Sequence, residues 1–466
     1  MPARAAFAIP AVLLLLASCT VGPNYKRPVV SVPEVYRGAA GANQPNAAAS
    51  LGDEKWWEVF QDPQLQTLIR TALKQNYTLQ IAAERVLQAQ SQLVITRSNQ
   101  FPVIDGNAQF SGTRSPGIPG VFKAYSYAAD ALNLSASWNV DFWGRYRRAT
   151  EAARASLRAT EWGQRAVVST LIENLAAAYF QLRELDLELE IAKRTLGSRQ
   201  QSLKLTQTLE QGGATSLVDV RQAQQLVEEA GGAIPETERQ IQVVEDQISI
   251  LLGENPSAIA RGRPLTEQRL PAAVPAGLPS TLLERRPDIR QAEQQLIAAN
   301  AEIGVARAQL FPQISLTGTG GVESIGLGNL FAWGARAWTY SAQATQPIFN
   351  AGSLRANVRL AEAQQQEALL TYKQTIQTAF REVSDSLIAY QKYREFREHQ
   401  QRLATAAQDA AHLSEIRYQG GAASYLEVLT NETTYFNAEI NFARAELNER
   451  LSLVQLYNAL GGGWQQ

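Results

Sequence analysis

The sequence has very few of the residues that bind metals or form disulfides. Its 466 residues include one cysteine, Cys19, two histidines, His399 and His412, and a single methionine at position 1. A structural metal site usually needs about four cysteine or histidine ligands, and a disulfide framework needs paired cysteines. The composition therefore argues against both. It also excludes a methionine-lined path for soft metals, although it does not exclude metal transport.

The usual catalytic motifs are missing as well. The chain has no His-Glu-x-x-His, no Gly-x-Ser-x-Gly, no P-loop and no cluster of cysteine and histidine. Its glycine-rich stretch at 318–321 lies in a strand-like run and not before a helix, which argues against a nucleotide site. The net charge is −1, so nothing indicates a nucleic-acid partner. We therefore expect no enzyme, no nucleic-acid binding and no metal or other cofactor beyond a covalent lipid.

The N-terminus has the pattern of a secretory signal, and no later segment reaches the roughly 20 apolar residues of a spanning helix. Arg4 precedes the apolar run "AAFAIPAVLLLLA", and small residues lead to Cys19. The stretch "LASC" (16–19) resembles the lipobox of bacterial lipoproteins. That resemblance implies removal of residues 1–18, acylation of Cys19 by lipid such as palmitate and, since Thr20 follows, export to the outer membrane. An ordinary signal peptide with an incidental cysteine is the alternative.

A duplication organises the rest of the chain. The stretch "QGGATSLVDV" (211–220) returns as "QGGAASYLEV" (419–428), 208 residues later and with six of ten positions identical. A Phe-Pro pair at 101–102 likewise returns at 311–312. A period this long is no solenoid repeat, so it indicates two copies of one module.

Each module contains one exceptionally long helical stretch. Residues 145–210 lack proline, and residues 354–418 lack both proline and glycine, while alanine, leucine, glutamate, glutamine and arginine dominate. A helix of this length is a rod of roughly 100 Å, which is typical of a coiled-coil-like assembly. Shorter helices are predicted at about 64–99, 217–252, 288–309 and 424–456. The stretch "AGGAIPETE" (230–238) should interrupt one of them, because two glycines and a proline disfavour a helix interior.

Each module also contains two strand-like runs. Apolar and polar residues alternate in "LNLSASWNVD" (132–141) and in "WTYSAQATQ" (338–346). Strands with one apolar and one polar face suit a transmembrane β-sheet around a wet lumen, although a half-buried sheet in a soluble protein shows the same pattern. Four strands cannot close a barrel and open edges are not tolerated in lipid, so the chain must oligomerise. Three copies would supply about twelve strands.

These patterns predict a mainly α fold with a transmembrane β part, built as a duplicated module of long helices plus four strands. The expected strands lie at about 102–114, 131–142, 312–323 and 337–349. The expected segments are the signal peptide 1–18, an acylated extended segment 19–62, a first repeat 63–253, an irregular proline-rich connector 254–286, a second repeat 287–460 and a tail 461–466.

Three stretches carry a family resemblance over nearly the whole mature chain. They are "CTVGPNYKRP" (19–28), "WWEVFQDPQLQTLIRTAL" (56–73) and the segment from Gly277 to Gly318. They resemble the TolC-like outer-membrane efflux channels, in the lipoprotein branch that includes NodT, OprM and CusC. The resemblance implies a homotrimer with a 12-stranded barrel in outer-membrane lipid above a 12-helix periplasmic tunnel.

The resemblance also implies partners and a cargo. Such channels dock with a periplasmic adaptor and an inner-membrane pump of the RND type, and they passively conduct drugs or other small toxic solutes to the exterior. The outer-membrane conduit of a type I protein-secretion system is the alternative, since it has the same architecture. A non-conducting structural lipoprotein would leave the alternating strands unexplained.

The repeated phrase itself predicts a turn between two helices. Its glycine pairs, Gly212 with Gly213 and Gly420 with Gly421, can end a helix, and Thr215, Ser216 and Ser424 can cap the returning one. In the family, such hairpins form the periplasmic gate. By that resemblance the gate residues are Asp219, Tyr418, Leu426 and Glu427.

The resemblance gives these four residues different roles. Asp219 is the expected partner of Tyr418 across neighbouring hairpins, and a ring of Glu427 carboxylates would favour cations. Thr430 and Ala423 occupy places where family members carry further charges, which argues against a second acidic ring and an arginine lock. Apolar packing around Leu426 and Leu429 should replace them. Tyr425 is a further candidate, while Arg221 and Arg417 are solvated helix-end charges in the simpler interpretation.

Overall fold

The structure is a computed structural model that describes residues 20–38, 50–121, 123–268 and 274–465. The predicted signal peptide and Cys19 lie outside the described residues. The chain divides into two compact units. The first unit comprises Met1–Val29, Arg85–Glu161 and Gln291–Lys373, and the second comprises Val30–Glu84, Trp162–Arg290 and Gln374–Gln466.

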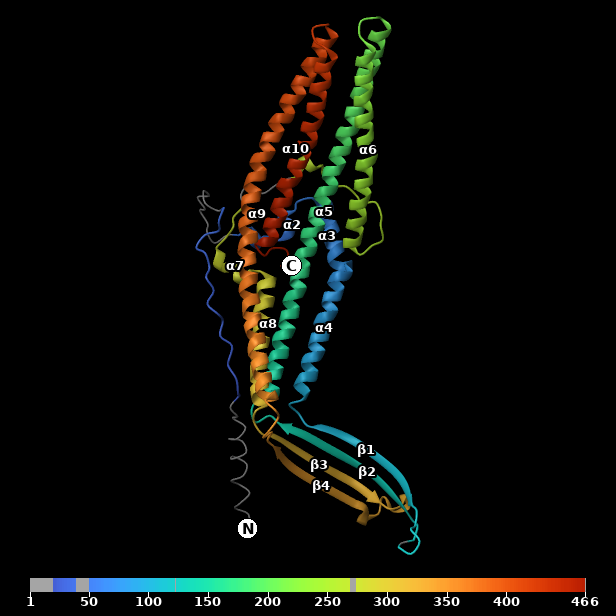
Figure 1. Ribbon diagram of the computed structural model, residues 1–466, viewed down its shortest axis with the longest axis vertical. Helices are drawn as coiled ribbons and strands as arrows, with labels where there is room; N and C mark the ends of the chain where they lie inside the picture. The colour runs from blue at the N-terminus through green and yellow to red at the C-terminus, as the bar shows by residue number, and fades with distance from the viewer. Residues whose placement is uncertain (1–19, 39–49, 122, 269–273, 466) are drawn as a thin grey trace. The chain divides into compact units, whose positions relative to one another are not determined.

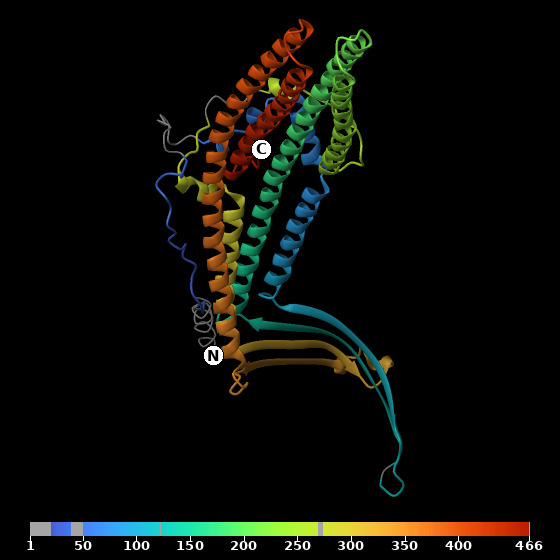
Figure 2. The same ribbon diagram turned by 45° about the horizontal axis from the view of Figure 1, so that its top comes forward.

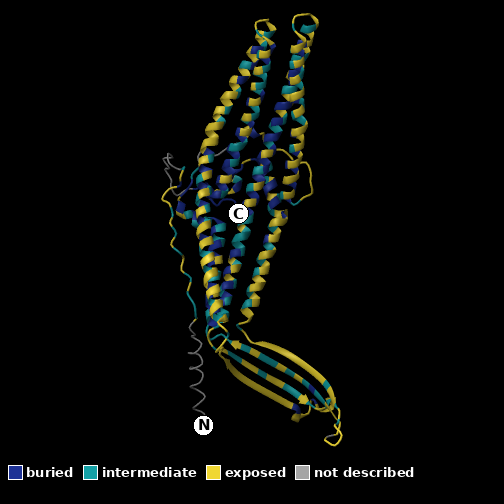
Figure 3. Cartoon of the chain, viewed as in Figure 1, coloured by how far each residue is buried: buried dark blue, intermediate teal, exposed yellow. Residues whose placement is uncertain are grey.

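The first unit contains a single antiparallel sheet among its described residues. Its strands are β1 (Val103–Ser115), β2 (Tyr125–Val140), β3 (Gln313–Ser324) and β4 (Arg336–Thr345), and they lie side by side in chain order (Figure 1). β1 and β4 are therefore the edge strands, and both are exposed along nearly their whole length (Figure 3).

The pairing registers divide this sheet into two chemically distinct faces. Gly106 lies opposite Leu134, Leu134 opposite Gly320, and Gly320 opposite Trp338, and every other pair follows the same unbroken registers. Even-numbered residues of all four strands therefore share one face, and odd-numbered residues share the other. The even face carries Ile104, Phe110, Leu132, Leu134, Trp138, Leu316, Trp338 and Tyr340. The odd face carries Asp105, Asn107, Gln109, Asn133, Ser135, Thr317, Thr339 and Gln343.

Two strand limits differ from the sequence prediction. β2 begins at Tyr125 and not near residue 131, because Tyr125 to Asp130 pair with the last residues of β1. β4 ends at Thr345 and not near residue 349. Pro347 follows closely, and a proline cannot donate a hydrogen bond to the sheet.

The N-terminal segment of the first unit packs closely on helix α8 (Pro287–Ala308). The backbones of Gly22 and Gly304 approach so closely that a β-carbon on Gly22 would lie 2.5 Å from Gly304 Cα. Arg27 forms an ion pair of 3.0 Å with the buried Glu293, and Asn300 donates to the Pro23 carbonyl at 3.0 Å. An extended strap thus runs along this helix.

The long helices are α5 (Arg145–Gln211) and α9 (Ser353–Gln419), each continuous and close to its predicted range. In the second unit, α5 turns back into α6 (Leu217–Leu252), and α9 turns back into α10 (Tyr425–Ala459) (Figure 2). Among the described residues, no helix combines the length and hydropathy that crossing a membrane would require.

The first predicted helix is divided into α3 (Pro63–Gln75) and α4 (Tyr77–Ser98). The break at Asn76 is stabilised by the side chain itself, which accepts a hydrogen bond from Leu79 N and donates one to the Leu251 carbonyl, both 2.9 Å long. Asparagine readily forms such local bonds, and they compete with helical hydrogen bonding.

The predicted interruption at residues 230–238 is wrong, because α6 is continuous through Pro235. A proline inside a helix loses one hydrogen bond, here to the Gly231 carbonyl, and its ring crowds that turn. The lost bond is tolerated within a helix of 36 residues.

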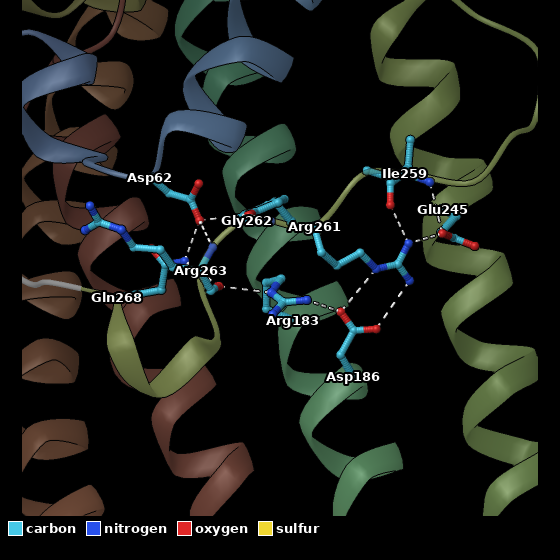
Figure 4. A network of polar contacts seen from close by, with 10 residues as sticks. Asp62, Arg183, Asp186, Glu245, Ile259, Arg261, Gly262, Arg263 and Gln268 are labelled. Carbon is cyan, nitrogen blue, oxygen red and sulfur yellow. Dashed lines mark hydrogen bonds and ion pairs between the residues drawn. The ribbon is translucent and has the colours of Figure 1, made fainter.

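The connector is more ordered than its composition indicated. It contains the short helix α7 (Pro279–Arg285), and a polar network fixes its first part to the helices (Figure 4). The buried Asp62 carboxylate accepts hydrogen bonds from Tyr179 (2.8 Å), from Arg263 N (3.0 Å) and from Gln268 (2.6 Å). Burial raises the pKa of Asp62, but these hydrogen bonds outweigh it and the net shift is downward.

Arg261, in the connector, extends this network to helices α5 and α6. Its guanidinium pairs with Asp186 of α5 at 3.2 Å and also with Glu245 of α6 (Figure 4). The connector therefore joins α5 to α6 away from their turn.

Candidate functional site

The candidate site consists of the two helix turns and the residues packed between them, all in the second unit. One turn joins α5 to α6 and the other joins α9 to α10, and each carries a copy of the repeated phrase (Figure 1). The two turns have the same backbone geometry but different side-chain contacts.

Only the second position of each glycine pair has a backbone conformation that favours glycine. Gly213 has φ 73° and Gly421 has φ 72°, in the left-handed region, whereas Gly212 and Gly420 have no positive φ. The Ala214 amide donates to the Leu209 carbonyl, and Ala422 to Arg417, both at 2.8 Å. These are Schellman turns, in which a left-handed residue lets the chain satisfy the last carbonyls of the helix.

The first turn is closed by a reciprocal cap between Ser216 and Asp219. The Ser216 amide donates to the Asp219 carboxylate at 3.1 Å, and the Asp219 amide donates to the Ser216 hydroxyl at 3.4 Å. The Thr215 hydroxyl donates to the same carboxylate. Hydrogen bonds from Thr215 and then Ser216 lower the pKa of Asp219. Asp219 is thus occupied within its own hairpin as a helix-capping group.

The second turn is held by an ion pair instead of a cap. Ser424 occupies the N-cap position but makes no side-chain cap. Glu427, at the position equivalent to Asp219, lies 3.3 Å from the Arg417 guanidinium. Arg417 therefore contacts the predicted gate acid directly and is more than a solvated helix-end charge.

An aromatic cluster packs the two hairpins of one chain together. The rings of Tyr418 and Tyr425 meet edge to face, with centroids 5.3 Å apart. Buried Tyr425 packs with Ala223 of α6 and Val428 of α10, and Leu203 and Leu429 contact the same cluster. The cluster thus joins α5, α6, α9 and α10.

Tyr418 and Asp219 do not form a hydrogen bond within the described chain. The Tyr418 hydroxyl is buried and has no hydrogen-bond partner there, while Asp219 bonds to Thr215 and Ser216. Their predicted contact, which is between neighbouring hairpins, remains a prediction. Leu426 is 57% exposed and Leu429 is partly buried, so only Leu429 contributes to packing inside one chain.

Arg199 is a residue that the sequence interpretation missed. Its side chain is only 1% exposed, and it donates to the Leu226 carbonyl at 2.9 Å and to Glu229 at 3.2 Å, while its guanidinium lies 5.1 Å from the Phe436 ring centroid. It thereby joins α5, α6 and α10. The spacing Leu196, Arg199, Leu203 was a usable signal, because it places the arginine on the apolar stripe of α5.

Three buried polar atoms, two of Arg199 itself and one of Glu432, lack hydrogen-bond partners in the described part of the chain. Arg199 Nε and Nη2 are buried without acceptors, and Glu432 Oε2 is buried without a donor. Burial raises the pKa of Glu432, and the positive charge of Arg199 opposes that shift.

A pair of buried carboxylates lies earlier in α5 than Arg199. Glu184 and Glu188 are one helical turn apart and are 4% and 8% exposed, and Arg444 of α10 bonds to Glu188 at 2.9 Å. Burial, followed by the Glu188 charge and hydrogen bond, raises the pKa of Glu184 to about 8. One arginine thus faces two carboxylates between α5 and α10.

Among the described residues, no group of three or more histidine, cysteine or acidic side chains could hold a metal ion.

Comparison with known proteins gives one consistent result. Residues 68–254 and 278–462 match the family model described as outer membrane efflux protein. The chain is 37% identical to the solvent efflux pump outer membrane protein SrpC of Pseudomonas putida, over 97% of both chains. It is 36% identical to the cation efflux system protein CusC of Escherichia coli, over 98% of both. The outer-membrane channel OprN superposes with a TM-score of 0.89 at 32% identity, over 96% of this chain and all of that one.

Proposed function

Because the chain belongs to the outer membrane efflux protein family, we propose that it is the passive outer-membrane duct of a tripartite pump for small toxic solutes. The observation that carries the proposal is the division of the sheet by residue parity. One face is apolar and suits lipid, and the other is polar and suits water, across four consecutive strands.

Closure of the sheet supports a trimer. β1 and β4 are edge strands with unpaired backbone groups, and such edges are costly in lipid. Pairing β4 of one copy with β1 of the next removes them, and three copies give a barrel of about twelve strands. OprN is described as an outer-membrane channel, and SrpC and CusC are named as parts of efflux systems, which agrees with a channel.

The polar face supports transport of neutral and cationic solutes. Its charged residues are Asp105 and Glu323, both exposed and both acidic. Carboxylates along a water-filled pore favour cations and disfavour anions. SrpC is named for solvents and CusC for cations, so their names agree with this substrate class.

We propose that Cys19 carries the lipid anchor. The next residue, Thr20, lies against Gly144, where a β-carbon would meet Thr20 Cγ2 at 2.8 Å, and Val21 N donates to the Trp143 carbonyl at 3.1 Å. Trp143 and Gly144 connect β2 to α5. An acyl chain on the preceding residue would start beside the membrane sheet, where it could reach the inner leaflet of the outer membrane.

The two helix turns are the proposed periplasmic gate, with Asp219, Tyr418, Leu426 and Glu427 as its residues. The Tyr418 hydroxyl, which has no hydrogen-bond partner among the described residues, and the exposed Leu426 support contacts there with a neighbouring copy. A periplasmic adaptor would link this end to an inner-membrane pump of the RND type. We propose that the duct performs no catalysis and needs no cofactor besides the lipid.

Two measurements together test this function. In a deletion strain, loss of the chain should increase sensitivity to solvents or cationic drugs, and the intact gene should restore resistance. The purified protein should conduct ions in planar bilayers. Unchanged sensitivity combined with loss of a secreted protein would instead indicate the secretion conduit, and absence of conductance would contradict a duct of either kind.

A further inference from the structure

The apolar face of the sheet carries two exposed arginines. Arg114 lies near the end of β1 and Arg336 begins β4, and both are even-numbered, so they share the face of Leu134 and Trp338. Asp130 is the third charged residue on this face, but it is only 4% exposed. The accessible charge on the lipid-facing side is therefore entirely positive.

Both arginines lie at the same end of the sheet. α4, α5, α8 and α9 connect to the sheet at residues 103, 140, 313 and 345. The opposite end contains the two strand connections, 116–124 and 325–335, and Arg114 and Arg336 lie beside them. In an outer-membrane channel with a periplasmic helical part, this end faces the exterior. The arginines are thus at the level of the outer lipid head groups, where long basic side chains extend toward water.

Assembly would bring the two arginines together. They lie on β1 and β4, the two edge strands, which are on opposite sides of the sheet in one chain. When β4 of one copy pairs with β1 of the next, Arg336 and the neighbour's Arg114 share one face at one end of adjacent strands. Like charges on adjacent strands repel each other unless an anion lies between them. This step rests on the trimer of the proposed function.

The surroundings of Arg336 favour a phosphate as that anion. Its guanidinium stacks on Trp333, 3.6 Å from the ring centroid, and Trp333 is 79% exposed. Stacking covers the flat face of the guanidinium and leaves its N–H edge available, which is the geometry that binds phosphate. Among the ion pairs of the described residues, none involves Arg114 or Arg336.

We propose that Arg114 of one copy and Arg336 with Trp333 of the next form a binding site for a phosphorylated lipid of the outer leaflet. A trimer has three such sites. Two guanidinium groups bind the phosphate, and the indole and the apolar face pack against the sugar and acyl chains.

The test uses the full-length trimer in nanodiscs and measures retention of bisphosphorylated lipid A against lipid A stripped of both phosphates. The unmodified protein should prefer the phosphorylated form. R114Q and R336Q should each weaken retention by about fivefold, the effect of one basic residue near an anionic surface. Glu323→Gln, at the same end but on the polar face, should leave retention unchanged.

Mass measurement before lipid is added separates the possible failures. If the unmodified chain is not trimeric, the proposed assembly fails and this site fails with it. If the trimer forms and conducts but does not distinguish the two lipids, only the lipid site is wrong. If the trimeric R114Q and R336Q variants retain the phosphorylated lipid as strongly as the unmodified protein does, the lipid site is wrong as well.

Discussion

The Arg417 guanidinium lies 3.3 Å from the Glu427 carboxylate, so an ion pair connects the last turn of α9 to the first turn of α10. The two side chains are 58% and 40% exposed, so the pair adds at most about 1 kcal/mol to stability. Its main effect is electrostatic. The positive charge that neutralises Glu427, the proposed gate acid, is supplied by Arg417 of the same hairpin.

This arrangement predicts opposite selectivity changes for the two partners. R417Q leaves Glu427 unneutralised, so cation preference in planar bilayers should rise. E427Q leaves Arg417 unneutralised, so cation preference should fall. Reversal potentials in a salt gradient measure both, and trimer mass is the control for assembly. If the two variants shift the potential in the same direction, Glu427 does not line the conducting path.

The turns predict that adjacent glycines differ in their tolerance of alanine. Gly213→Ala forces a side chain into the left-handed region and should cost about 1–2 kcal/mol. A β-carbon on Gly213 would meet nothing within 4 Å, so the cost is entirely one of backbone conformation. Hydrogen exchange at the end of the hairpin should therefore accelerate by roughly 5–30-fold. Gly212→Ala is the control, with a change of about 0.5 kcal/mol or less. Equal effects would rule out the Schellman geometry.

Replacing Arg199 should destabilise the packed hairpins more than replacing the neighbouring Glu432. Arg199→Met removes the charge that offsets Glu432 and the bond to Leu226, and should cost about 3 kcal/mol, the low end for breaking a buried pair because Glu229 is half exposed. Glu432→Gln should cost less, since Glu432 Oε2 has no donor in the described chain. Hydrogen exchange in both hairpins measures the difference. A larger loss for Glu432→Gln would contradict the role given to Arg199.

Glu184 predicts a pH dependence of stability. Its pKa is raised from 4.5 to about 8, so the folded protein holds a proton that the unfolded chain releases. Stability should therefore fall as pH rises from about 5 to about 8, and the loss should be complete above that range. Glu184→Gln keeps the group neutral and should raise the melting temperature of the trimer by several degrees at pH 8, with little change below pH 4.5. A difference of the same size at both pH values would show that Glu184 does not titrate in this window.

Regular features of the fold were predictable, and individual contacts were not. The lack of proline in residues 145–210 indicated a long helix, and α5 (Arg145–Gln211) covers this range. The alternation of apolar and polar residues from Leu132 indicated a strand, and β2 covers it as far as Val140. The break at Asn76 depends on a hydrogen bond to Leu251, which is 175 residues away in sequence. Sequence periodicity carries no information about such a partner.

For the candidate site, the positions of the turns were predictable from the sequence, but the contacts of their side chains were not. The repeated glycines indicated both turns, but the two acids at equivalent positions behave differently, and only contacts explain why. Asp219 accepts hydrogen bonds from Thr215 and Ser216, whereas Glu427 forms an ion pair with Arg417. The burial of Arg199 was readable from its apolar spacing, yet its contacts with α6 and α10 required the packed structure.

The most direct test of a water-filled pore compares two adjacent residues of β3. Thr317 lies on the polar face and Leu316 on the apolar face. Each is replaced by cysteine, and single-channel conductance is recorded before and after addition of a charged, membrane-impermeant thiol reagent. If the polar face lines the pore, conductance should fall stepwise for Thr317→Cys and stay unchanged for Leu316→Cys. The reverse pattern, or no conductance in either protein, would contradict it.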